Sequence, residues 1–292
     1  MKKYYKIIIA FSLLFAVAFS SCELYNPAEP IPAYIHIQKI DLTTTATQGT
    51  NSSKISDAWV YIDEQLIGCF ELPATFPVLY DGKHRIRIKP GIKVNGIATN
   101  RSYYPFYNFI EQDIDLQKGA VTTLTPTTTY TSATVYEFMS DFETTGTTID
   151  TVKGKTDTTL QIIYSAIPHE NVFEGTHSAI AYLDPVNTRF ECATVTPMVL
   201  PQYGSPVFLE FNYKCNYGFT VSIYAYGAAT SAQFVVLRFN QSLTWNKAYV
   251  YLTPSVSSAS SALNYKIAWG MINNTAEDSI SLSLDNIKII HN

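Results

Sequence analysis

The sequence predicts an all-β fold of two β-sandwich domains. Nearly every apolar pattern repeats with a period of two, as in half-buried strands. No segment after the N-terminal leader shows the apolar spacing of an amphipathic helix. Hydrophobic residues make up 47% of the 292 residues, enough for a sizeable core. Short strands with long loops are typical of sandwiches rather than of closed barrels.

Two strands are predicted in the first half of the chain. In the segment 58–63, small and aliphatic residues alternate with polar or aromatic ones, so the former share one face. The segment 84–88 alternates in the same way and places Arg85 and Arg87 outward. Between these strands the Asp-Gly pair at 81–82 supplies turn chemistry.

The second half contains longer strand patterns. The segments 207–215 and 219–226 both alternate, and residues 216–218 between them, Asn-Tyr-Gly, predict a hairpin. The last strand is predicted over 280–284 and runs on into 285–289.

Charge is scarce in this sequence. Charged residues make up 15% of the chain, below the roughly 25% of an average soluble domain, and the net charge is −4. The 21 tyrosines help to raise the aromatic content to 14%. This net charge leaves no electrostatic footprint for a phosphate backbone, so we expect no nucleic-acid partner.

The N-terminus has the pattern of an export signal. An apolar run over 7–19 is preceded by Lys2, Lys3 and Lys6 and followed by two serines. The run is shorter than the roughly 20 residues needed to cross a bilayer. We therefore expect no transmembrane helix after processing.

Residues 19–22, Phe-Ser-Ser-Cys, resemble the lipobox of bacterial lipoproteins. The resemblance implies that Cys22 is diacylated and becomes the new N-terminus. It implies a protein that is lipid-anchored at the outer membrane and displayed on the cell surface, with the periplasmic face as an alternative. A plain secretory signal, in which Cys22 has no role, is the other interpretation.

Changes in composition divide the chain into five parts. Residues 1–21 form the signal peptide and 22–32 a proline-rich tether, which is stiff and extended. A first domain is predicted over 33–121 and a second over 136–292. The Thr-rich segment 122–135 is too poor in apolar residues for a core and is predicted to be a linker.

The segment 58–91 resembles the PEGA-type small β-domain of bacterial envelope proteins. Eight positions match the family pattern in order: Val60, Ile62, Asp63, Gly68, Pro73, Thr75, Gly82 and His84. Glu64 replaces the usual glycine of the first turn. The resemblance implies a non-catalytic envelope module.

The second domain resembles the jelly-roll modules of Bacteroidota surface lipoproteins and glycan-degrading enzymes, including galactose-binding-like and carbohydrate-binding folds. Five segments carry the resemblance: 140–143, 175–179, 209–214, 245–249 and 284–287. It implies that the second sandwich is a jelly roll. In many such modules acidic residues of the opening and closing strands hold a structural calcium, and the matching positions are Asp141, Glu143 and Asp285. The alternative is that these acids cap loops or face water.

No motif for catalysis is present in the sequence. None of the five histidines belongs to a G-x-S-x-G or H-E-x-x-H arrangement, so we predict that the protein is not an enzyme. Glycoside hydrolysis needs only two carboxylates at a fixed separation, and it stays as an alternative. Cys69, Cys192 and Cys215 match no metal or redox spacing. The latter two either form a disulfide or are buried free thiols.

A binding face is predicted on the hairpin. If its aliphatic residues point inward, Glu210, Asn212, Lys214, Tyr224 and Tyr226 share the other face. Aromatic rings flanked by hydrogen-bonding side chains suit a glycan ligand. The alternative is that outward tyrosines reflect only the β propensity of this residue.

Two functions follow from these patterns. The first is a non-enzymatic surface lipoprotein that binds carbohydrate or mediates adhesion. The second is an accessory lipoprotein of an outer-membrane complex for secretion, gliding or nutrient import, in which the same surfaces contact protein. Trp59, outward beside Tyr61 in the first domain, is a candidate for such a partner interface.

Overall fold

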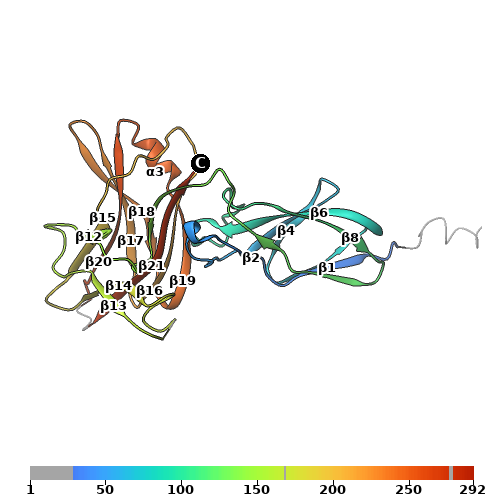
Figure 1. The fold of residues 1–292 in the computed structure, drawn as a ribbon, viewed down its shortest axis with the longest axis horizontal. Coiled ribbons are helices and arrows are strands. Elements are labelled where there is room, and N and C mark those ends of the chain that lie inside the picture. The colour runs from blue at the N-terminus through green and yellow to red at the C-terminus, as the bar shows by residue number, and fades with distance from the viewer. Residues whose placement is uncertain (1–28, 168, 276–278) are drawn as a thin grey trace, which may run out of the picture.

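The computed structural model describes residues 29–167, 169–275 and 279–292, and it confirms the all-β fold (Figure 1). Two strand-rich units follow each other along the long axis of the molecule (Figure 1). The described helical segments are short: η1 (Ala46–Gln48), η2 (Val94–Gly96) and α3 (Thr253–Ser258). In the described residues, no helix has the length and apolar character needed to span a membrane. Cys22 and the predicted signal peptide lie outside the described residues.

The first unit is a sandwich of two sheets with a short additional ladder. The larger sheet contains, in order, β4 (Gln65–Glu71), β3 (Asp57–Ile62), β6 (Gly82–Lys93) and β7 (Arg101–Tyr103), with β8 (Ile110–Leu116) also paired to β6. The smaller sheet contains, in order, β5 (Ala74–Val78), β1 (Ala33–Ile37) and β9 (Val121–Leu124). The ladder pairs β2 (Asp41–Leu42) with β10 (Thr127–Thr128).

Both strands predicted in this unit are confirmed. Val60 and Ile62 of β3 are fully buried in a core that both sheets share. Arg85 and Arg87 of β6 face outward and form ion pairs with carboxylates of β8. The period-two pattern therefore identified both the strands and their buried faces.

The second unit is a larger sandwich. One sheet contains, in order, β13 (Gln161–Tyr164), β14 (His177–Leu183), β21 (Ile280–His291), β16 (Val207–Cys215) and β19 (Ser242–Tyr251), with β11 (Val135–Ser140) paired to β21. The other contains, in order, β12 (Ile149–Thr151), β15 (Arg189–Thr194), β20 (Asn264–Ile272), β17 (Phe219–Tyr226) and β18 (Ser231–Phe239). We call these the six-stranded and the five-stranded sheet.

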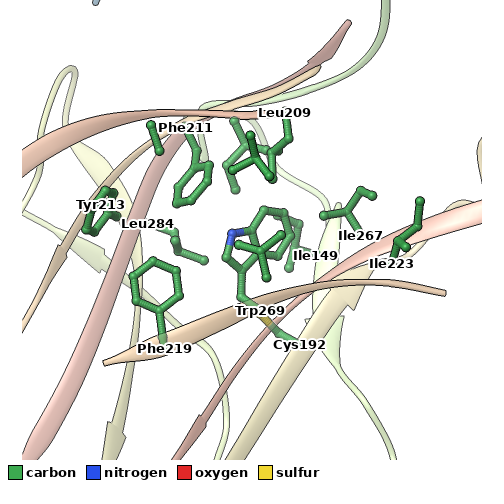
Figure 2. Packing of buried hydrophobic residues seen from close by; sticks show 14 of the residues in the cluster. Ile149, Cys192, Leu209, Phe211, Tyr213, Phe219, Ile223, Ile267, Trp269 and Leu284 are labelled. Atoms are coloured by element: carbon green, nitrogen blue, oxygen red, sulfur yellow. The ribbon is translucent and has the colours of Figure 1, made fainter. Parts of the chain in front are cut away.

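The core of this sandwich is centred on Trp269. Phe211 and Leu284 of the six-stranded sheet face Phe219, Cys192 and Trp269 of the five-stranded sheet (Figure 2). The rings of Phe211 and Trp269 meet edge to face, with centroids 5.9 Å apart. Side chains from both sheets thus form one continuous apolar layer.

The predicted hairpin over 207–226 is wrong. The strands β16 and β17 exist, but β16 pairs with β19 and β21, whereas β17 pairs with β18 and β20. The turn between them therefore crosses from one sheet to the other. Alternation alone cannot distinguish this crossing from a hairpin, because inward residues meet the same core in both arrangements.

The predicted linker over 122–135 also needs correction. Most of its first half is paired, because β9 lies parallel to β1 and β10 parallel to β2. Tyr130 is buried, and β11 already belongs to the second sandwich. Main-chain pairing, which does not depend on apolar side chains, orders these threonines, and β-branched residues suit strands.

The two units pack tightly on each other. An aromatic cluster from the first unit covers the outer face of the six-stranded sheet. It joins Tyr104, Phe106, Tyr107 and Tyr130 to Phe208, Tyr249 and Ile290. The Tyr104 ring meets the Phe208 ring edge to face at 5.1 Å. The aromatic side chains at 104–107 and at 130 thus hold the first unit against the second.

Charged groups are buried at the centre of this interface. The carboxylate of Glu210 accepts hydrogen bonds from the hydroxyls of Tyr104 at 2.8 Å and of Tyr130 at 2.9 Å. The Nζ atom of Lys247 lies 3.2 Å from the same carboxylate. Burial lowers the pKa of Lys288 to about 8, although the nearby Glu210 acts in the opposite direction. The first unit thus encloses one carboxylate and two lysines.

The cysteines in the described residues are free. Cys192 lies on β15 and Cys215 on β16, in different sheets, and both are buried. Burial raises the pKa of Cys192 and of Cys215. The structure therefore confirms the alternative of buried thiols over a disulfide.

Candidate binding groove on the five-stranded sheet

The five residues predicted to share one face are divided between two sheets. Tyr224 and Tyr226 are half-exposed on the outer face of β17. Glu210 and Asn212 lie on β16 with 0% and 1% of their surface exposed, because the first unit covers them. The Nζ atom of Lys214, also on β16, donates to a main-chain oxygen of the loop before β14 at 2.8 Å. The prediction of a single face is wrong, because Lys214 is half-buried on the other sheet and only the two tyrosines lie on the outer face of the five-stranded sheet.

Asn212 contributes instead to the contact between the units. Its Nδ2 group donates to Ser52 Oγ at 2.9 Å. Nearby, the Nζ atom of Lys54 donates to Asn246 Oδ1 at 2.6 Å. Both bonds connect the loop between η1 and β3 with the six-stranded sheet, so the polar residues of β16 and β19 position the first unit.

Two of the three predicted calcium ligands are hydrogen-bonded to protein groups in the opening loops. Asp141 Oδ1 accepts the main-chain N–H of Glu143 at 3.1 Å. Glu143 Oε1 accepts the main-chain N–H groups of Thr176 and His177 at 2.7 and 2.8 Å. Burial raises the pKa of Glu143, but hydrogen bonds from His177 and Thr176 outweigh burial and lower the pKa to about 2. These carboxylates therefore cap loops, as the alternative proposed.

The third predicted ligand, Asp285, is in a similar situation. Its carboxylate accepts main-chain N–H groups from Phe173, Glu174 and Asn286 at 3.2, 3.3 and 2.7 Å. Burial nevertheless raises its pKa to about 7. Within the described ranges, no three His, Cys, Asp or Glu residues gather as they do around a metal ion. The calcium site remains a prediction from the resemblance.

A network of polar side chains holds Tyr224 in place. Its hydroxyl donates to Glu191 of β15. The Nζ atom of Lys155 donates to Tyr224 Oη at 2.7 Å and to Gln233 Oε1 at 2.5 Å, and Gln233 Nε2 donates to Glu191 Oε2 at 3.0 Å. The Tyr226 ring lies beside that of Tyr224, with centroids 6.2 Å apart and planes at 19°. Burial and the Glu191 carboxylate raise the pKa of Tyr224.

Small residues form the floor beside this network. Strand pairing places four residues in one row across the sheet: Glu191, Gly270, Thr220 and Arg238. In the adjacent row Ala268 pairs with Ser222. A Cβ atom added to Gly270 would lie 3.4 Å from its nearest neighbour, the Thr220 hydroxyl. The backbone therefore tolerates a side chain here, and its absence leaves the middle of the row open.

This open row lies in a groove of about 490 Å³. The polar side chains that line the groove come from three strands and the adjoining loops: Lys155, Arg189, Glu191, Tyr217, Thr220, Arg238, Asn240 and Asn274. Lys155 and Glu191 belong both to this lining and to the network around Tyr224. The groove and the tyrosine pair are therefore parts of one surface. Such a concave surface with convergent polar groups is a typical small-ligand site.

The sequence contained signals for part of this groove. Arg189 and Glu191 alternate with the buried residues Phe190 and Cys192, which marks them as outward residues of a strand. Lys155, by contrast, lies in a loop 69 positions before Tyr224, and no local pattern relates the two residues. Its place over the sheet depends on the path of the chain after β12.

A second aromatic surface lies on the larger sheet of the first unit. The Nζ atom of Lys89 lies over the rings of Tyr61 and Tyr103, 5.2 and 4.9 Å from their centroids. Trp59 meets Tyr103 edge to face at 6.3 Å. A Cβ atom on Gly91 would lie 3.1 Å from the Trp59 indole, so this glycine makes room for the indole. We call Trp59, Tyr61, Lys89 and Tyr103 the Trp59 surface.

No protein-family model matches the chain, and no curated protein matches it. Among solved structures, it is similar to a xylan-binding domain from Paenibacillus barcinonensis, with 17% identity and a TM-score of 0.37 over 53% of this chain and 99% of that domain. It is also similar to the family 11 carbohydrate-binding module of a Clostridium thermocellum cellulase, with 13% identity and a TM-score of 0.38 over 55% and 97%. A cleaved adhesin domain of Lys-gingipain from Porphyromonas gingivalis matches at 16% identity and a TM-score of 0.34 over 54% and 99%. These are likenesses to β-sandwich modules and assign no family.

Proposed function

We propose that this protein is a non-enzymatic surface lipoprotein that binds carbohydrate or mediates adhesion through the groove on the five-stranded sheet. The observation that supports this proposal is the groove of about 490 Å³ beside the Tyr224 and Tyr226 rings. Sugars present an apolar ring face and many hydroxyls, so they require aromatic rings next to hydrogen-bonding side chains.

The geometry gives the two tyrosines different roles. Lys155 Nζ lies 4.8 Å from the centroid of the Tyr224 ring, and Tyr226 lies beside that ring. Tyr224 is thus held in a fixed position by Lys155 and Glu191, two residues that line the groove. Tyr226, whose hydroxyl makes no hydrogen bond to any described residue, is the ring that we expect a sugar to contact first.

The double substitution Tyr224→Ala and Tyr226→Ala tests the site. We expect the wild-type protein to bind a subset of a glycan array, and the double variant to bind those glycans roughly tenfold more weakly or not at all. The Gly270→Ala variant should also weaken binding, because its methyl group occupies the groove floor without a steric conflict at 3.4 Å. Isothermal titration with the best glycan measures both effects.

Tyr182→Ala is the matched control. Tyr182 is an exposed tyrosine of β14, on the six-stranded sheet, and 45% of its surface is accessible. This variant should bind as the wild type does. Equal loss in the control and the double variant, or full binding by the double variant and by Gly270→Ala, would place the glycan site elsewhere.

The anchor at Cys22 is a separate part of this proposal. It rests on the export signal and on the lipobox-like residues 19–22. Labelling with radioactive palmitate should mark the wild-type protein and should be lost in Cys22→Ser. Labelling that persists in this variant contradicts the anchor and the outer-membrane location.

The Trp59 surface favours the second function, an accessory subunit of an outer-membrane complex. Tryptophan and tyrosine are enriched among the residues that dominate protein interfaces. Tyr103 of β7 and Phe109, just before β8, are 47% and 53% exposed. A partner that is recovered in mild detergent with the wild type but not with Trp59→Ala, together with a negative glycan array, would favour this function over carbohydrate binding.

A further inference from the structure

The groove on the five-stranded sheet is more basic than the chain as a whole. Among the described residues that line it, Lys155, Arg189 and Arg238 stand against one carboxylate, that of Glu191. The complete chain has a net charge of −4, so this concentration of positive charge is local.

The three basic side chains differ in their hydrogen bonds and ion pairs. Arg189 donates from Nη2 to Asp157 Oδ1 at 3.0 Å and from Nε to Asp157 Oδ2 at 3.4 Å. Lys155 is bound within the Tyr224 network and lies 3.7 Å from Glu191 Oε1. The guanidinium group of Arg238 forms no ion pair or hydrogen bond with any residue in the described part of the chain.

The position of Arg238 relative to the tyrosines is fixed by strand register. Arg238 pairs with Thr220 of β17, and Tyr224 lies four residues further along the same strand, on the same face. At about 3.3 Å per residue, the two positions are roughly 13 Å apart. Between these two positions on β17 lies Ser222, a small and buried residue, and Gly270 lies beside Thr220 in the row of Arg238.

We propose that the groove selects acidic saccharides, with the anionic group of the sugar bound by Arg238. This inference rests on the proposed carbohydrate-binding function and names its ligand class. A guanidinium group donates in a planar fork that matches carboxylate and sulfate oxygens. The hydrogen bonds within the Tyr224 network keep Glu191 occupied at the other end. Arg238 is the lining cation without a partner among the described residues, and its guanidinium group can receive the anion.

The test compares acidic glycans with their neutralised forms. An array of neutral, uronate-containing and sulfated oligosaccharides identifies the acidic glycans that bind, and each is then titrated beside its carboxyl-reduced or desulfated counterpart. We expect the acidic form to bind at least about tenfold more tightly, with a preference that declines as salt rises. Uronate or sulfate preference shows which anion the site takes.

Arg238→Gln should abolish the preference for the acidic form while leaving the weaker binding of the neutral form. The control is Arg85→Gln, which removes the same charge from an exposed arginine of the first unit. If neutral and acidic forms bind the wild type equally, or if Arg238→Gln keeps the preference, the inference is wrong and the carbohydrate-binding function stands. If the wild type binds no glycan of any class, both are wrong.

Discussion

Replacing Glu210 by alanine should lower the free energy of unfolding by about 3–5 kcal/mol, the range for breaking a buried ion pair from one side. Glu210 is fully buried and is the only carboxylate within hydrogen-bonding or ion-pair distance of Lys247 among the described residues. Its removal leaves the buried Lys247 without its counter-charge, and Lys288 keeps only the nearby Glu174. It also leaves the Tyr104 and Tyr130 hydroxyls without an acceptor. Urea unfolding followed by fluorescence measures the change.

Two further variants separate the causes of this loss. Glu210→Gln keeps an oxygen acceptor for the tyrosines but removes the charge, so we expect an intermediate loss. The double variant Glu210→Leu with Lys247→Met replaces the ion pair by apolar groups, and it should be more stable than Glu210→Ala. A double variant as unstable as Glu210→Ala would show that an uncompensated charge is not the main cost.

Glu64→Ala is the matched control for Glu210. Glu64 also forms an ion pair, with Arg87, but 62% of its side chain is exposed. Water screens such a pair, and its loss should change stability by less than about 1 kcal/mol. A loss as large as that of Glu210→Ala would contradict the role of burial at the interface.

Replacing Trp269 by alanine should have an effect of similar size, a loss of about 3–5 kcal/mol. Trp269 is fully buried between the two sheets of the second unit (Figure 2). Its removal takes away the contact with Phe211 and leaves a cavity that rigid strands cannot close. Thermal and urea unfolding of the purified full-length variant measure the loss of stability.

Two comparisons make this prediction specific. Trp269→Phe should cost much less than alanine, because phenylalanine keeps an aromatic ring and removes an indole N–H that has no hydrogen-bond partner in the described structure. Trp245→Ala changes the same residue type at a partly exposed position on the edge strand β19. Its loss should be smaller than that of Trp269→Ala, and equal losses would contradict the central place of Trp269.

The strands were predictable because local patterns determine them. The alternation in 58–63 and 84–88 identified β3 and β6 and their buried faces correctly. The strands β16, β17 and β21 were found for the same reason. A strand with one face on a core must alternate, whatever it pairs with.

The partners of these strands were not predictable. A short turn between β16 and β17 fits a hairpin as well as a crossing between sheets, and the tertiary structure has the crossing. Because β16 and β17 belong to different sheets, Glu210 and Asn212 lie apart from Tyr224 and Tyr226. In addition, period two marks Glu210 as facing away from the sandwich core, but it cannot show that a second unit covers that face.

The candidate groove contains residues that the sequence pattern predicted and residues that it could not predict. Tyr224 and Tyr226 followed from alternation along one strand. Lys155 and Arg238, in contrast, reach the same face from a loop and from a neighbouring strand. Contacts between residues so far apart in sequence arise only from strand order and register.

The sequence by itself thus determined the all-β class, five of the strands and which of their residues point away from each core. Only the tertiary structure decided which of those outward faces meet a second unit and which stay open. The physical reason is that an outward polar residue has the same local pattern in water and in a buried polar contact. At Glu210 two tyrosines and a lysine replace water, whereas at Arg238 the surface is left accessible.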